Sequence, residues 1–147
     1  NRVTWFDELG VGGAATPKHP GADGIFPWFS KLDFLALEAV ETAYPIRFLA
    51  VTSRGLSGGK GKHRGGNGVA KSYKLLQDAT VSWAVEQTAA NKAVGGDGGK
   101  SAAPAMVLVA QDKNPAVEQA NVGHLTLKSG DIVTIMSPGG GGFGADE

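Results

Sequence analysis

The sequence has no cysteine, few aromatic residues and no net charge. The lack of cysteine among its 147 residues excludes a disulfide framework, a thiolate nucleophile, an iron–sulfur cluster and a zinc finger. Fourteen basic residues balance fourteen acidic ones, so no net field favours nucleic acid, an anionic membrane or an acidic substrate. Net charge therefore points to no partner.

Long hydrophobic runs are also missing. The most apolar stretch, 105–110, is far shorter than the roughly 18 residues that span a bilayer. The first residues lack the basic-then-apolar order of a secretory signal. We therefore expect a cytoplasmic protein with no membrane partner. The content of Leu, Ile, Val and Phe is high enough for folding, and the length predicts one domain over residues 1–147.

Glycine is the residue in excess, with 23 of the 147 positions. It clusters in segments 10–24, 55–68, 95–99 and 139–144. One interpretation is four flexible loops. The other is extended polyproline II-like segments, whose backbones approach closely because they carry no side chains. The last run suits the second interpretation best, since Pro138 restricts φ to the polyproline value and Phe143 supplies an anchor.

The segments between the glycine clusters are typical of β-strands. Alternation and β-branched residues predict strands at 46–52, 69–75, 79–85, 105–110, 122–127 and 132–136. We expect 69–75 to form a hairpin with 79–85, and 122–127 to form one with 132–136 through a turn at 128–131. Residues 34–44 are compatible with a short amphipathic helix that ends at Pro45 or with a strand pair, and we favour the helix. The predicted fold class is mainly β, with barrel-like or sandwich β-sheets, glycine-rich polyproline II-like segments and little helix.

No sequence motif indicates a phosphate, metal or nucleophile site. Residues 95–101 end in Gly-Lys-Ser, but the first glycine of a P-loop would have to be Val94. The three histidines are scattered along the sequence, and there is no Gly-x-Ser-x-Gly elbow. Ser57, which precedes two glycines, is interpreted as a turn residue.

A basic cluster invites a nucleic-acid interpretation. It consists of Lys60, Lys62, His63, Arg64 and Lys71. Single-strand binding normally adds aromatic side chains for base stacking, and only one tyrosine lies nearby. The alternative is a turn in which Arg64 bonds carbonyl groups or a carboxylate. We expect no nucleic-acid partner.

Four collinear blocks resemble the carboxy-terminal part of the hydantoinase B/oxoprolinase family. The first is Glu38-Ala-Val-Glu41 with Tyr44-Pro-Ile46, and the second is Ser57-Gly-Gly-Lys-Gly-Lys-His-Arg-Gly-Gly-Asn-Gly-Val69. The third is Asp78-Ala-Thr-Val-Ser82. The fourth joins Leu127-Lys-Ser-Gly-Asp-Ile-Val133 to Ser137-Pro-Gly-Gly-Gly-Gly-Phe-Gly144.

The resemblance implies a small structural subunit of a multi-subunit ATP-dependent ketone carboxylase, with acetophenone as the expected ketone. Subunits of a hydantoinase, an oxoprolinase or an acetone carboxylase are the alternatives within the family. A stand-alone β-barrel binding module is the competing class. The expected partners are a larger hydantoinase B-like subunit and a hydantoinase A-like subunit of the kinase type. ATP and a divalent metal are expected on those partners, with no cofactor in this chain.

The resemblance also implies which residues have structural or interface roles. They are Ser57, Gly58, Gly59, Gly61, Arg64, Gly65, Gly66, Gly68, Gly130, Asp131, Pro138, Gly139, Gly140, Gly141, Gly142 and Gly144. The metal-binding histidines and aspartates of the related carboxylases belong to a region that this sequence does not match. We therefore expect no catalytic, cofactor-binding or metal-binding residue here, and we expect the isolated chain to be inactive.

Overall fold

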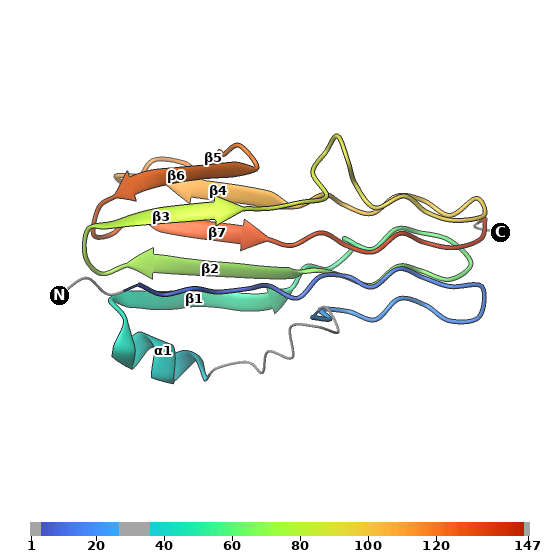
Figure 1. The fold of residues 1–147 in the computed structure, drawn as a ribbon, viewed down its shortest axis with the longest axis horizontal. Coiled ribbons are helices and arrows are strands. Elements are labelled where there is room, and N and C mark those ends of the chain that lie inside the picture. The colour runs from blue at the N-terminus through green and yellow to red at the C-terminus, as the bar shows by residue number, and fades with distance from the viewer. Residues whose placement is uncertain (1–3, 27–35, 146–147) are drawn as a thin grey trace.

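The computed structural model describes residues 4–26 and 36–145. These residues form one short helix and seven strands (Figure 1). The elements are α1 (Leu37–Ala43), β1 (Ile46–Ser53), β2 (Val69–Leu75), β3 (Ala79–Ala84), β4 (Met106–Ala110), β5 (Val117–Glu118), β6 (Val122–Leu127) and β7 (Ile132–Met136). The prediction of a mainly β fold is confirmed. No helix among the described residues has the length and apolar character needed to cross a membrane.

The strands form two antiparallel sheets. The larger has the order β1-β2-β7-β4-β5, and the smaller pairs β3 with β6. The expected helix is present over residues 37–43, ends before Pro45 and buries Val40. Residues 34 and 35 of that prediction lie outside the described residues.

Both predicted hairpins are wrong, although their strands are present. Strand β2 pairs with β1 and β7, while β3 pairs with β6 in the other sheet. Strand β7 likewise pairs with β2 and β4 and not with β6. Each short connection therefore carries the chain from one sheet to the other. Alternation identifies the buried face of a strand, but it does not identify the strand's neighbour.

The two connections lie against each other. The backbone N–H of Gly130 donates to Leu75 O at 2.8 Å, and the Leu75 N–H donates to Asp131 O at 2.9 Å. The Asp78 carboxylate accepts from Lys128 Nζ at 2.8 Å and from the Ser129 N–H at 3.0 Å. These bonds hold the two crossover turns together at one end of the sheets.

The core lies between the sheets and beneath the segment that precedes the first glycine cluster. From the large sheet, Tyr73, Val107 and Val133 point into it, and Trp83 and Leu127 enter from the small sheet. The predicted strand at 105–110 is half-buried, because alternate residues of β4 face the core. Ring contacts join Trp5, which precedes the first glycine cluster, to this core: its ring centroid lies 5.7 Å from that of Tyr73.

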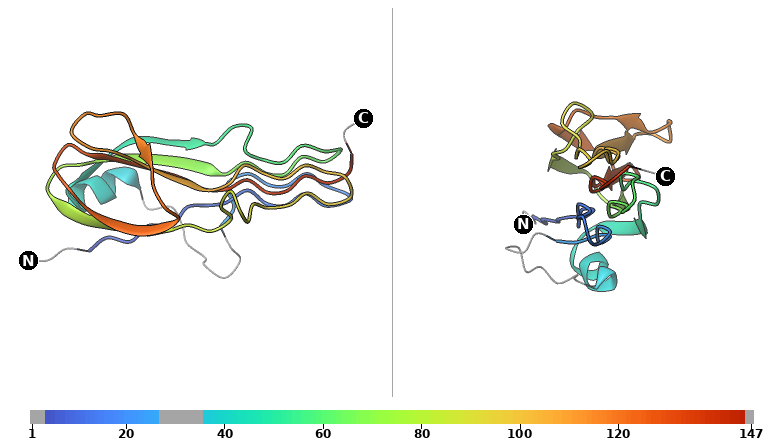
Figure 2. Two further views of the ribbon diagram at one scale, coloured as in Figure 1. Left: turned by 90° about the horizontal axis from the view of Figure 1, so that it is seen from above. Right: turned by 90° about the vertical axis from the view of Figure 1, so that its right-hand side faces the viewer.

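The glycine clusters extend away from the sheets as a bundle of side-by-side extended segments (Figures 1 and 2). We call residues 10–25, 57–68, 94–103 and 138–144 the glycine bundle. The first three of these segments each fold back on themselves. The fourth is a single segment that continues from β7 and lies among the other three. The close packing of glycine backbones is thus observed, whereas the polyproline II conformation stays a prediction.

Candidate functional site

The segment 138–144 occupies the interior of the glycine bundle. Its amides donate outward to different neighbours: Gly140 N–H to Gly66 O at 2.9 Å, and Gly142 N–H to Lys100 O at 3.0 Å. Its carbonyls accept in turn, with Gly140 O receiving the Gly59 N–H at 2.9 Å. Hydrogen bonds to all three folded-back segments therefore hold the bundle together.

The glycines of the bundle are required by the closeness of their neighbours. At most of the predicted motif glycines, a Cβ atom would overlap backbone atoms of an adjacent segment. These are Gly58, Gly59, Gly61, Gly65, Gly66, Gly68, Gly139, Gly140, Gly141 and Gly142. Gly144 differs, since its φ of +77° favours glycine and the side chain of Lys62 lies close to it. The structure thus brings the glycine-rich motif at 57–69 into direct contact with the glycine-rich motif at 137–144.

Packing backbone against backbone leaves little room for side chains where the glycine segments meet. The Gly-Lys-Ser end of segment 95–101 is part of this packing, because the Lys100 N–H donates to Lys60 O at 2.7 Å. That amide is therefore engaged and does not face a phosphate. Within residues 4–26 and 36–145, no group of three or more His, Asp or Glu side chains is arranged to hold a metal ion.

Ser57 and Asn67 build the base of the second folded-back segment. The Ser57 hydroxyl donates to Arg54 O at 2.6 Å and accepts the Gly68 N–H at 2.9 Å. The Asn67 side-chain oxygen accepts the N–H groups of Ser57 and Gly58, each at 3.1 Å. The Ser57 side chain is buried and hydrogen-bonded to nearby backbone groups, as expected of a turn residue.

Arg64 pairs with a carboxylate of the same chain. Its two terminal nitrogens donate to Asp23 Oδ1 at 2.8 Å and Oδ2 at 3.3 Å, and Asp23 Oδ1 also accepts the Asn67 N–H at 2.7 Å. The Arg64 hydrogen bond lowers the pKa of Asp23 and raises the pKa of Arg64. Both side chains are exposed, at 54% and 41%, so the pair contributes only about 0–1 kcal/mol. Its role is to join the first folded-back segment to the second.

Arg54 was missed by sequence reasoning and joins the sheet to the bundle. Its Nη1 donates to the carbonyls of Pro104 and Ser137, the latter at 3.1 Å. Its other terminal nitrogen lies 3.6 Å from Met106 Sδ. Burial lowers the pKa of the Arg54 guanidinium. One side chain thus connects the end of β1 to the residues flanking β4 and β7, and no local sequence signal marks it.

The turn at 128–131 has the predicted glycine conformation, with Gly130 at φ +102°. Asp131 is buried, and its carboxylate accepts the Lys128 N–H at 2.8 Å and the Asp112 N–H at 3.1 Å. Pro138 is also buried at the start of the central segment, where its carbonyl accepts the Gly12 N–H. Asp131 and Pro138 thus fix the two ends of the stretch that contains β7, from the turn at 128–131 to the start of the central bundle segment.

The structure divides the basic cluster of the sequence. Lys71 is buried on β2, where its Nζ bonds Asp7 Oδ2 at 2.6 Å and lies 5.9 Å from the centre of the Phe48 ring. Arg64 is paired with Asp23, while Lys60 and Lys62 are exposed near the tip of the bundle. The cluster is therefore not a continuous cationic surface.

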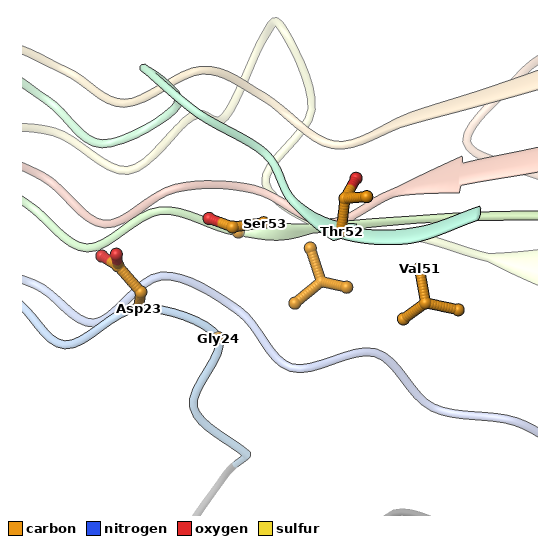
Figure 3. Close-up of a pocket in the computed structure, with 7 residues that line it drawn as sticks. Asp23, Gly24, Val51, Thr52 and Ser53 are labelled. Atoms are coloured by element: carbon orange, nitrogen blue, oxygen red, sulfur yellow. The ribbon is translucent and has the colours of Figure 1, made fainter. Parts of the chain in front are cut away.

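A groove of about 270 Å³ lies where the bundle meets β1 (Figure 3). It is lined by Asp23, Gly24, Val51, Thr52, Ser53, Gly68 and Val69. The one charged group in this lining, the Asp23 carboxylate, is already bonded to Arg64 and Asn67. The groove therefore presents no unengaged charged group among the residues that line it.

These features define a β-protein whose glycine-rich segments form a packed backbone bundle, joined to the sheet by buried polar groups. The Hydantoinase B/oxoprolinase family model matches residues 1–146. The chain belongs to the hydantoinase B/oxoprolinase family.

Individual relatives agree with this assignment. An uncharacterized protein of Methanocaldococcus jannaschii is 37% identical over 109 residues, which are 74% of this chain and 19% of the relative. A 5-oxoprolinase of Dictyostelium discoideum is 26% identical over 95% of this chain and 11% of its own length. The chain thus spans less than a fifth of the length of these curated relatives.

Two solved structures share the fold. An ATP-dependent caprolactamase from Pseudomonas jessenii superposes with a TM-score of 0.72 at 22% identity, covering 93% of this chain and 24% of the caprolactamase chain. An acetone carboxylase in its nucleotide-free form gives a TM-score of 0.71 at 20% identity, covering 92% of this chain and 22% of the other. In both, the fold of this chain is part of a much longer polypeptide.

Proposed function

We propose that the chain is a small structural subunit of a cytoplasmic, multi-subunit, ATP-dependent ketone carboxylase that acts on acetophenone. The proposal rests on one observation above all. The full fold matches a minor part of much longer relatives, and its distinctive feature is a bundle of packed glycine backbones. A bundle whose interior is mostly packed glycine backbone is suited to a structural role between larger subunits.

The proposed partners carry the chemistry. A larger hydantoinase B-like subunit and a hydantoinase A-like subunit of the kinase type would hold ATP and a divalent metal. The two solved relatives are an acetone carboxylase that carries out ATP-dependent acetone carboxylation and an ATP-dependent caprolactamase, which supports ATP as the energy source. The backbone N–H of Lys100 is already hydrogen-bonded to Lys60 O, which supports placing the ATP site on another subunit.

The test is to isolate the chain from its own cells in its native assembly and identify every co-purifying polypeptide. We expect large subunits of both kinds, and ATP hydrolysis by the assembly that depends on acetophenone and bicarbonate. The purified chain alone is the control and should neither hydrolyse ATP nor carboxylate a ketone. Activity of the chain alone, or a native mass near 15 kDa without partners, would contradict the proposal.

A second candidate is a component of an ATP-dependent enzyme that opens cyclic amides. It is favoured by the 5-oxoprolinases among the curated relatives and by the caprolactamase among the solved structures. The same assembly distinguishes the two, because ATP hydrolysis would then depend on 5-oxoproline or a hydantoin and not on a ketone.

A stand-alone nucleic-acid-binding module is the remaining alternative. The burial of Lys71 and the pairing of Arg64 leave fewer free cations than the sequence suggested. Salt-dependent binding of a single-stranded oligonucleotide that is lost in Lys60→Ala/Lys62→Ala would favour this alternative.

A further inference from the structure

The two faces of the large sheet have different surroundings. Register places Val69, Lys71 and Tyr73 of β2 on the same face as Val133 of β7 and Val107 of β4. All of these are buried, beneath the small sheet and the segment that contains Trp5. We call this the inner face, and the opposite one the outer face.

The outer face is apolar in its middle and is not covered by any described element. Its central side chains come from three adjacent strands: Ala70, Ser72, Met106, Leu108, Ala110, Ile132, Thr134 and Met136. Each is only half-buried, and none belongs to the core cluster. A hydrogen bond of 2.9 Å from Thr134 Oγ1 to Ser72 Oγ confirms that these strands present that set of residues to one side. In Figure 2, the small sheet and the segment before the first glycine cluster lie together on the opposite side.

One corner of the outer face carries two adjacent cations. Arg47 and Lys74 are direct cross-strand neighbours, both exposed, and neither forms an ion pair with a described residue. Like charges placed opposite each other on one face destabilise an isolated sheet. Carboxylates on a covering layer would relieve this repulsion.

We propose that the outer face is the surface through which this chain joins a hydantoinase B-like large polypeptide, whose contacting layer is apolar with carboxylates opposite Arg47 and Lys74. The inference rests on the proposed function, because it names the surface that binds one of the proposed partners. In the solved relatives, this fold covers 22% and 24% of chains that continue well beyond it. A long polypeptide is therefore joined to this fold in each of them.

The size of the face argues against a second copy of this chain as its occupant. The five strands lie about 4.8 Å apart and average about five residues, which gives a face of about 20 Å by 17 Å, or about 340 Å². A stable pair of proteins needs about 800 Å² from each partner. Such a face suits one contact within a larger interface. Charge also argues against a second copy. The strand residues of this face include one acidic side chain, Glu118, which is too few to pair with both Arg47 and Lys74.

The test uses the native assembly, with a photo-crosslinking residue placed at Ala50 on the outer face or, as the control, at Val122 on β6. Both positions are exposed, so neither replacement disturbs the core. We expect cross-links to the hydantoinase B-like subunit from position 50 and not from position 122. Cross-links to that subunit from position 122 alone, or from position 50 to a second copy, would overturn the inference and leave the proposed function intact.

Binding variants give an independent readout. Arg47→Glu/Lys74→Glu and Leu108→Arg should each weaken association with the large subunit at least tenfold, while Val122→Arg and Lys92→Glu should not. Thermal unfolding of each variant shows whether the fold is retained, and the charge-reversed pair alters only exposed groups. Wild-type affinity of both outer-face variants overturns the inference. If the wild-type chain assembles with no hydantoinase B-like polypeptide, the proposed function fails and this inference fails with it.

Discussion

The α-carbon of Gly65 lies so close to Gly140 that a methyl group on it would overlap the Gly140 carbonyl oxygen. These residues belong to two motifs that are 75 positions apart in the sequence, and both are buried. The carbonyl cannot yield easily, because the Gly59 N–H also donates to it at 2.9 Å.

Gly65→Ala is therefore expected to destabilise the chain by at least about 3 kcal/mol, in the range of severe overpacking. Gly55→Ala is the matched control, because nothing lies within 4 Å of its added methyl group. It should change stability by less than about 1 kcal/mol. Urea unfolding of the two variants measures the difference. Equal stabilities would mean that the bundle is not packed as described.

Arg54→Met should cost about 2–3 kcal/mol. The change leaves the carbonyls of Pro104 and Ser137 without the charged donor that they share, at the junction of sheet and bundle. Arg47→Met removes the same charge from an exposed position and should have little effect on the isolated chain. Denaturant unfolding of both variants tests this. A fully stable Arg54→Met chain would show that the junction does not need the guanidinium.

The buried pair of Lys71 and Asp7 predicts a non-additive effect. Asp7→Asn leaves the ammonium of Lys71 buried without a counter-charge, which should cost about 3 kcal/mol. Adding Lys71→Met to that variant should restore most of the loss, since the long side chain stays packed and the charge is gone. Lys74→Met, on an exposed position of the same strand, should restore nothing. A double-mutant cycle in urea measures the coupling, and additive losses would refute it.

Tyr73 makes the chain sensitive to alkaline pH. Burial, with a smaller effect from Asp7, raises the pKa of the Tyr73 hydroxyl from 10.0 to about 12. The folded chain therefore keeps its proton where the unfolded chain has lost it. This contribution is fully present below pH 10 and is lost as the pH rises through about 12, a change of about 3 kcal/mol.

Tyr73→Phe should remove that part of the alkaline loss, whereas Tyr44→Phe should keep it. The measurement is the free energy of unfolding in urea between pH 8 and pH 12. Parallel curves for wild type and Tyr73→Phe would contradict the assigned shift.

The strands could be predicted from the sequence, but their partners could not. Alternation along 69–75 and 79–85 predicted two strands and their buried faces correctly, although the second strand ends at Ala84. The short connection between them suits a hairpin as well as a crossover. The choice is made by pairing with β7 and β6, far away in the sequence. A period-two pattern depends only on the residues of one strand, whereas the order of strands in a sheet depends on residues far apart in the sequence.

The bundle could be anticipated only as one of two interpretations. Glycine composition is compatible with loops and with close packing, and the difference lies in which segments become neighbours. The side-chain hydrogen bonds that join distant segments could not be predicted from the sequence either. Arg54 bonds Pro104, 50 positions away, and Arg64 bonds Asp23, 41 positions away. No residue adjacent to either arginine signals these partners.

The central position of segment 138–144 imposes an order on biosynthesis. A ribosome makes this segment after all of the segments that it holds together, so they emerge without their shared hydrogen-bonding partner. Closure of the bundle must then wait for the most distant contacts in the chain, which is the topology that slows folding. Nascent chains stalled before residue 138 are expected to keep the glycine segments open to proteases and chaperones, and those released after residue 144 to protect them.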